Sequence, residues 1–329
     1  MANDNRDDEF LVSRIIFLTT YGTNIKLAIL VEKYHLADTI VQNLARHAER
    51  LRLKTSATVA NPMDEMALAE TAKLLFNITH FSPKHVSAFT GAISPIATLL
   101  CEHSIPSPTA PLSPPFGLLV NALLNLDLAS EDIQSALYSE EAPDALAKRL
   151  VELLDLSTQV YSDLELDQSV ASLVGVIGQI YSTAPDRVRQ DIRDKLLPTE
   201  QDRQSVLGSG TSLSSRLLRN STNPAAPEFG KAISNLFFDM SDRDAAKFVQ
   251  NVGYGFASGY LFQNNLPVPD PASEADTAAG KRGINPITGQ FLDAEKFADV
   301  PEMTEEEKER EAEKLFVLFE RLVAPLPCL

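Results

Sequence analysis

The sequence predicts an all-α protein of stacked helices, and three observations carry this prediction. The first is the spacing of apolar residues, which recur at helical rather than strand intervals. Five of them share offsets of 0, 4, 7, 8 and 11, which place them on one helical face: Phe229, Ile233, Leu236, Phe237 and Met240. The second is the frequency of proline after a polar residue, as at Pro62 and Pro83, where one helix ends and the next begins. The third is an internal repeat.

In this repeat, an amide side chain recurs beside apolar residues along the first 240 residues or so. Successive amides lie 34, 48, 54 and 56 residues apart. They are Asn43, Asn77, Asn125, Gln179 and Asn235. Periods of this order, filled with helices of roughly 10–18 residues, are typical of armadillo and HEAT proteins. We therefore predict an armadillo/HEAT-like superhelical solenoid over residues 1–263.

The repeated amides are candidate partner-binding residues. Stacked repeats would bring the helices that carry them alongside one another and would form a concave face. Side-chain amides there can both donate hydrogen bonds to the backbone of a bound peptide and accept them from it. The alternative is that each amide only satisfies the backbone of a neighbouring loop.

Composition changes after Leu261. Residues 264–283 are rich in Pro, Ala, Asp and Gly, which predicts a flexible, acidic linker over residues 264–303. This linker contains the turn-forming sequence Asn285-Pro-Ile-Thr-Gly289. Ser273 precedes Glu274 and Asp276, so it is a candidate phosphorylation site for an acid-directed kinase.

The last predicted element is an amphipathic helix over residues 304–324. Thr304 and Glu307 have the spacing of a capping box, and acidic residues in the first turn complement the helix dipole. An apolar stripe follows at i, i+3, i+4 and i+7, formed by Leu315, Leu318, Phe319 and Leu322. We expect this stripe to dock, either on the body of the protein or on a partner.

Charge and composition exclude several classes of protein. The net charge of −16 argues against a nucleic-acid binder and against attraction to an anionic membrane surface. Only Cys101 and Cys328 are present, which favours a reducing compartment over a disulfide framework. The N-terminus is polar and acidic, unlike a signal peptide, and neither uncharged stretch, 104–126 or 168–185, suits a transmembrane helix. We expect a cytoplasmic protein.

No pattern in the sequence predicts catalysis, a metal or a cofactor. Gly253, Gly255 and Gly259 come near a dinucleotide-binding loop, but the third glycine is one position late and the preceding segment is helical. These glycines instead predict a tight turn between two helices. The five histidines and two cysteines lack the spacing of a zinc site.

Three segments resemble the synembryn family (resistance to inhibitors of cholinesterase). They are Leu74–Thr79, the segment FVQNVGYGFASGYL at Phe248–Leu261, and Asn285–Gly289 followed by Met303–Leu315. The second is similar to the family's F-x-x-x-x-G-Y-G-x-A-x-G-x-L pattern. The third looks like its N-P-x-T-G and M-T-E-E-x-K-E-x-E-A-x-K-L tail. The likeness covers most of the chain, and its most specific motifs follow Phe248.

The resemblance implies a cytosolic armadillo/HEAT-type protein that binds monomeric G-protein α subunits (Gα). Members of the family act as guanine-nucleotide exchange factors and as folding chaperones for Gα. The resemblance implies that the concave face grips the C-terminal helix of Gα and that the tail contacts its nucleotide domain. It also implies recruitment to the membrane at the cell cortex through Gα. No catalytic residue is required, because tighter binding to nucleotide-free Gα weakens GDP binding by linkage.

Family chains are longer, and the similarity begins partway through their solenoid. We therefore expect the first few helices of the family's solenoid to be absent, which would leave an uncapped apolar edge. The alternative function is an armadillo-type peptide-binding adaptor or scaffold without exchange activity. Faster GDP release from Gα would distinguish the first function from the second.

Overall fold

The computed structural model describes residues 5–21, 26–53, 61–105, 107–138, 142–269, 282–285 and 287–295, with Lys308, Arg310, Glu313 and Lys314. Helices dominate these residues. The described segments contain no β-strand beyond a single antiparallel bridge between Ile284 and Phe291. The all-α prediction is therefore confirmed.

The α-helices are α1 (Arg6–Thr20), α2 (Leu27–Glu32), α3 (Leu36–Leu53), α4 (Pro62–Phe81), α5 (Ile93–Glu102), α6 (Phe116–Leu124), α7 (Glu131–Leu137), α8 (Ala145–Val160), α9 (Asp163–Glu165), α10 (Ala171–Thr183), α11 (Asp186–Leu196), α12 (Leu213–Ser221), α13 (Pro227–Met240), α14 (Ala245–Val252) and α15 (Tyr254–Gln263). Three short 3-10 segments, η1 (Pro83–Ala92), η3 (Asp202–Gln204) and η4 (Leu292–Ala294), and a π-helical turn, η2 (Leu166–Val170), complete them.

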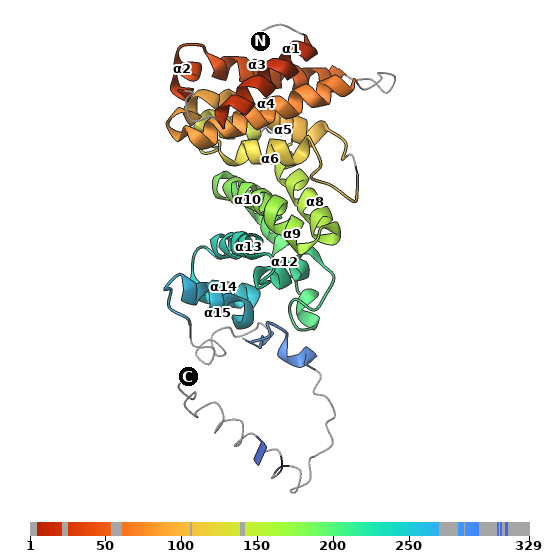
Figure 1. Cartoon of the computed structure of the whole chain (residues 1–329). Helices are drawn as coiled ribbons and strands as arrows, with labels where there is room; N and C mark the ends of the chain where they lie inside the picture. The colour runs from red at the N-terminus through yellow and green to blue at the C-terminus, as the bar shows by residue number, and fades with distance from the viewer. Residues whose placement is uncertain are drawn as a thin grey trace.

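The helices form an elongated stack of two layers (Figure 1). One layer consists of α1, α4, α6, α10 and α13, each packed on the next. The second layer runs beside it through α3, α5, α8 and α12. Ser13 contacts Thr71 and Thr20 contacts Asn77, so residue numbers rise together and α1 runs parallel to α4. Parallel, equivalent helices packed on their neighbours are consistent with the predicted solenoid.

Local sequence explains why these helices begin and end where they do. The side chain of Asn61 accepts a hydrogen bond from the backbone N–H of Met63, and Pro62 occupies the first helical position of α4. At the other end of the chain, Gly253 (φ +84°) separates α14 from α15, as the glycine spacing predicted. The five apolar residues expected on one face of α13 are all buried.

One hydrophobic core runs through both layers, from Val31 near the amino end to Leu261 in α15. Among the described residues, none of the helices combines the length and apolar character that crossing a membrane requires. The boundaries predicted at 263 and 303 stay predictions, because most of residues 264–303 lie outside the described part. Of residues 304–324, only Lys308, Arg310, Glu313 and Lys314 are described, so the C-terminal helix also stays a prediction.

Candidate functional site

Three of the repeated amides form a row along the first layer. Asn77 Nδ2 donates to Thr20 Oγ1 of α1 at 2.8 Å. Asn125 Nδ2, at the end of α6, donates to Thr79 Oγ1 of α4 at 3.3 Å. Gln179 Nε2 of α10 donates to the carbonyl of Leu124 at 2.8 Å. Each amide therefore ties its helix to the preceding helix of the same layer.

The other two amides lie apart from this row. Asn43 is buried in α3, and its side-chain oxygen accepts from the guanidinium of Arg46. Asn235 on α13 is exposed and accepts from the hydroxyl of Tyr260 at 2.9 Å. Asn43 and Asn77 are too deeply buried to face a partner in this structure.

The remaining predicted site residues fall in parts of the chain that are not described. Leu315, Leu318, Phe319, Leu322 and Ser273 all lie outside the described residues. Their roles in partner binding and phosphorylation therefore stay predictions. The partner-binding role of the five amides also stays a prediction.

A buried arginine at the carboxyl end of the stack joins three segments that are distant in sequence. Arg203 is 8% exposed, and its Nη1 donates to the carbonyl of Gly289 at 2.9 Å. Its Nη2 donates to the carbonyls of Gln250 at 3.0 Å and Asn251 at 2.9 Å, at the end of α14. We call Arg203 and these three carbonyls the Arg203 junction. Burial lowers the pKa of Arg203 from its ordinary value.

The Arg203 junction holds a loop whose sequence dictates its shape. The Asn285 side chain accepts from the backbone N–H of Ile287 at 2.9 Å, and the N–H of Gly289 donates to the Asn285 carbonyl at 2.8 Å. Gly289 has φ +67°, and a Cβ there would overlap the side chain of Leu207. Further backbone hydrogen bonds join Leu207 to Thr288 and Phe291 to Arg203. The N-P-x-T-G sequence therefore builds a loop that docks on the solenoid.

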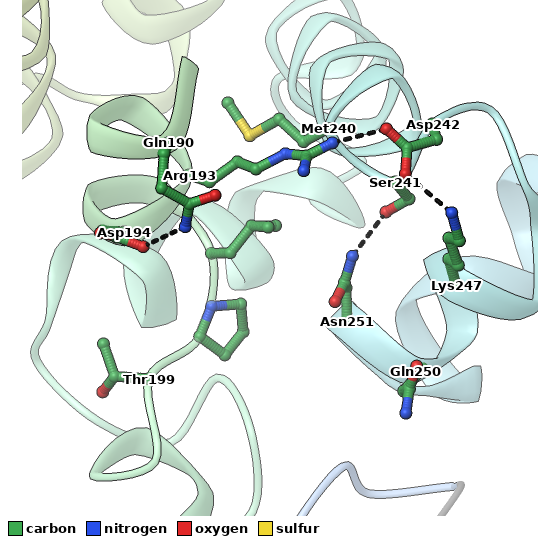
Figure 2. A pocket seen from close by; sticks show the side chains of 12 residues that line it. Gln190, Arg193, Asp194, Thr199, Met240, Ser241, Asp242, Lys247, Gln250 and Asn251 are labelled. Carbon is green, nitrogen blue, oxygen red and sulfur yellow. Dashed lines mark hydrogen bonds and ion pairs between the residues drawn. The ribbon is translucent and has the colours of Figure 1, made fainter. Parts of the chain in front are cut away.

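Next to this junction lies a polar cleft of about 600 Å³ (Figure 2). It separates the carboxyl end of α11 from α14 and from the turn that follows α13. Its lining residues are Gln190, Arg193, Asp194, Leu197, Pro198, Thr199, Met240, Ser241, Asp242, Lys247, Gln250 and Asn251. Gln250 and Asn251 belong to both features, so the cleft and the Arg203 junction are continuous.

One carboxylate braces the two sides of the cleft. Asp242 accepts from Lys247 Nζ at 2.8 Å and from Arg193 Nη2 at 2.6 Å. The hydrogen bonds from Lys247 and Arg193 lower the pKa of Asp242. Asp242 and Arg243 both have φ of 57°, a left-handed conformation that turns the chain sharply between α13 and α14. The brace fixes the spacing of the two cleft walls.

The cleft contains amides, hydroxyls and paired charges. Such groups suit recognition of a polar protein surface rather than of an apolar small molecule. Within the described residues, no group of His, Cys, Asp and Glu side chains could hold a metal ion. Neither the cleft nor the role of Arg203 could be predicted from the sequence, because nothing in the local pattern distinguishes this arginine from a surface one.

Comparisons with known proteins connect this architecture with a family. A family profile described as guanine nucleotide exchange factor synembryn matches residues 1–324. A synembryn-like chaperone of Schizosaccharomyces pombe is 26% identical over 291 residues, covering 82% of this chain and 54% of the relative. The Ric-8A chaperone of Macaca fascicularis is 27% identical over 339 residues, covering 96% of this chain and 62% of the relative. The Ric-8A chaperone of Rattus norvegicus is 27% identical over 289 residues, covering 82% of this chain and 54% of the relative. The chain therefore spans about half to three fifths of the length of these relatives.

Proposed function

Because the chain belongs to the synembryn family of guanine nucleotide exchange factors, we propose that it binds Gα, promotes GDP release and assists Gα folding. The family acts on G-protein α subunits, and relatives of this chain are named as chaperones. The solenoid provides an extended surface for a protein partner, as stacked helical repeats commonly do.

The observation that carries the proposal is the docking of the N-P-x-T-G loop at the carboxyl end of the stack. The Arg203 junction fixes this loop beside the polar cleft. The predicted amphipathic helix begins at residue 304, nine positions after Glu295, the last residue of the docked segment. A tail anchored in this way starts from a fixed point, so it can act together with the solenoid in a two-part grip on Gα.

Exchange by such a grip requires no covalent chemistry from this chain. If the solenoid and tail bind nucleotide-free Gα more tightly than GDP-bound Gα, the affinity of Gα for GDP falls by the same factor. GTP then fills the empty site and favours release of the complex. The same preference for an open, unliganded Gα accounts for assistance with folding, because it stabilises the Gα chain before nucleotide binds.

We assign the contacts with Gα to two sets of residues. Within the described amides, Asn125, Gln179 and Asn235 are at least partly exposed and are the candidates on the solenoid. The candidates on the tail are Leu315, Leu318, Phe319 and Leu322. Phosphorylation of Ser273 would add negative charge to the segment between these two sets. The place of action is the cytoplasm, with recruitment to the cell cortex through Gα.

A GDP-release assay tests the proposal. Purified Gα loaded with labelled GDP is mixed with the full chain, and we expect release to accelerate severalfold. Leu318→Asp places a charge on the tail stripe and should reduce this acceleration. Leu164→Asp, on the exposed side chain of α9, is the matched control and should leave it unchanged.

Two outcomes would contradict the proposal. If the chain formed no complex with any Gα, neither exchange nor chaperone activity would be tenable. If the chain bound Gα or other peptides without accelerating GDP release, the adaptor function would be favoured instead. A second experiment tests the chaperone activity separately. Gα is synthesised in a cell-free system with and without the chain, and the yield of GTP-binding Gα is measured.

A further inference from the structure

The segment that docks at the carboxyl end of the stack is organised largely by contacts within itself. We call this segment, residues 282–285 and 287–295, the strap. An antiparallel bridge between Ile284 and Phe291 pairs its two halves. Arg282 forms an ion pair with Asp293 at 2.8 Å, and its guanidinium lies 4.1 Å from the centre of the Phe291 ring. A segment that holds its own shape loses little conformational entropy when it docks, as a preorganised peptide ligand does.

The strap meets the solenoid mainly through its backbone. Three N–H groups donate to carbonyls across the contact, those of Phe291 to Arg203 at 2.9 Å, Leu207 to Thr288 at 3.1 Å and Gly255 to Ile287 at 3.3 Å. The guanidinium of Arg203 adds a bond to the carbonyl of Gly289. Such bonds provide affinity for an extended peptide, and buried side chains provide specificity. In the strap these side chains are Gln290 and Phe291, which are 8% and 5% exposed.

Glycines on both sides permit this close approach. A Cβ at Gly289 would lie 2.3 Å from Leu207 Cδ1, and a Cβ at Gly253 would lie 3.4 Å from the backbone nitrogen of Gly289. A Cβ at Gly255 would lie 3.4 Å from the carbonyl oxygen of Ile287. The glycines between α14 and α15 therefore leave room for the strap as well as turning the chain.

The strap lies outside the main hydrophobic core. Within the described residues, that core runs to Leu261 and leaves out Phe291, although Phe291 is buried. Ile287 and Leu292 of the strap are 61% and 52% exposed. Release of the strap would therefore break few apolar contacts, which is typical of the parts of a structure that open most easily.

From these contacts we propose that the carboxyl end of the solenoid is a peptide-binding site whose ligand is the chain's own strap, which docks and releases as a unit. We call the site, formed by Arg203, Leu207, Gly253 and Gly255, the strap dock. Arg203 is its positioning residue, because it ties a strap carbonyl to the end of α14. Docking fixes the origin of the tail, so release of the strap lowers the acceleration of GDP release; this consequence rests on the proposed function.

Peptide capture by the full chain tests the strap dock without Gα. Because the strap belongs to the same chain, its effective concentration is on the order of millimolar, and a free peptide at micromolar concentration cannot displace it. Gly289→Ala should empty the dock, since the new Cβ is strained at positive φ and overlaps Leu207. A labelled peptide of residues 282–295 should then bind the variant at least about tenfold more tightly than the native chain, as measured by fluorescence anisotropy.

Matched variants show whether capture depends on the dock. Gly259→Ala is the control, because a Cβ at Gly259 meets no atom within 4 Å, and this variant should behave as the native chain does. Adding Arg203→Lys to Gly289→Ala should weaken capture about tenfold, because a lysine cannot reach three carbonyls at once. Arg203 also holds α14, so Gly255→Val is a second test: it obstructs the dock beside Ile287 and should weaken capture in the same way.

Hydrogen exchange separates release of the strap from unfolding of the solenoid. In Gly289→Ala, exchange should rise in residues 287–295 and at the amide of Leu207, with α10 to α13 unchanged. GDP release tests the consequence for the tail. Its acceleration should fall severalfold in Gly289→Ala and stay at the native level in Gly259→Ala.

The possible failures are distinguishable. If the peptide does not bind Gly289→Ala, or if exchange in that variant rises throughout α10 to α13, the strap is an integral part of the fold and the proposal is wrong. If Gly289→Ala accelerates GDP release as the native chain does, the dock does not position the tail, while the proposed exchange function stands. If neither chain accelerates release, the proposed function and the role of the dock in exchange both fail, and peptide capture still decides whether the dock binds the strap.

Discussion

At the scale of single residues, Glu9 shows how a buried charge joins helices. It is 2% exposed, and its Oε1 lies 3.0 Å from His47 Nε2 of α3 and accepts from Thr71 Oγ1 of α4 at 2.9 Å. Burial opposes ionisation, but the interactions with His47, Thr71 and Arg46 outweigh it, so the pKa of Glu9 lies below its ordinary value of 4.5. Folding therefore favours the ionised form of Glu9.

The lowered pKa of Glu9 makes the free energy of unfolding depend on pH in a definite direction. The contribution of Glu9 is fully present above the pKa of the unfolded chain and is lost as the pH falls through the lower folded pKa. We predict that Glu9→Gln lowers the free energy of unfolding by about 1–3 kcal/mol at pH 7, since it leaves buried partners poorly matched. The difference in the free energy of unfolding between the native chain and the variant should shrink as the pH falls from 5 to 3.

Urea unfolding at several pH values measures this difference. Glu65→Gln, on the exposed side of α4, controls for the removal of one negative charge. If the deficit of Glu9→Gln were the same at pH 7 and pH 3, the interaction between Glu9 and His47 would not favour the ionised carboxylate.

At the scale of elements, α13 depends on a cap that its own sequence does not supply. Ala226, the residue at its N-cap, provides no side-chain hydrogen bond. Asp167 Oδ1, in the π-helical turn η2 before α10, accepts from the backbone N–H groups of Glu228 at 2.7 Å and Phe229 at 3.0 Å. One repeat therefore caps the next, and the negative charge also favours the amino end of the helix dipole.

We predict that Asp167→Ala lowers the free energy of unfolding by about 1–2 kcal/mol, the usual effect of losing an N-cap. Asp167→Asn keeps an acceptor oxygen without the charge, so it should have a smaller effect. Chemical unfolding followed by circular dichroism provides the measurement. Asp186→Ala is the control, because Asp186 is exposed in the first turn of α11 and pairs with Arg189 of the same helix. An equal loss in Asp167→Ala and Asp186→Ala would argue against the inter-repeat cap.

At the scale of the whole molecule, stability should vary along the stack. In each layer a helix packs mainly on its neighbours, so the two ends have few direct contacts with each other. The ends also differ chemically. The amino end exposes Leu11, Ile15 and Leu18 of α1, whereas at the carboxyl end the docked segment, residues 282–285 and 287–295, contacts the solenoid through the Arg203 junction.

This arrangement predicts that a core defect acts locally. Leu261→Ala opens a cavity in α15, where Leu261 is fully buried, and should cost about 2–5 kcal/mol. Hydrogen exchange measured by mass spectrometry should rise in α13–α15 and in residues 282–295, with little change in α1–α5. Ile40→Ala in α3, also fully buried, is the matched control and should give the opposite distribution. Uniformly faster exchange in either variant would show that the stack unfolds as one unit.

The sequence by itself determined the helices, because helical periodicity and capping depend on residues within a few positions of one another. The buried face of α13 and the turn at Gly253 could be predicted in this way. So could the turn in the N-P-x-T-G loop, since Asn285 and Gly289 make it through local hydrogen bonds.

Only the tertiary structure decided how the polar residues are used. Asn77 reaches Thr20 across 57 positions, Asp167 caps Glu228 across 61, and Arg203 holds Gly289 across 86. The residues around an amide, a carboxylate or a guanidinium in the sequence look the same whether that group is exposed to solvent or joins two repeats. Its role is decided by which backbone groups the stack brings within hydrogen-bonding distance, and that depends on how the repeats pack.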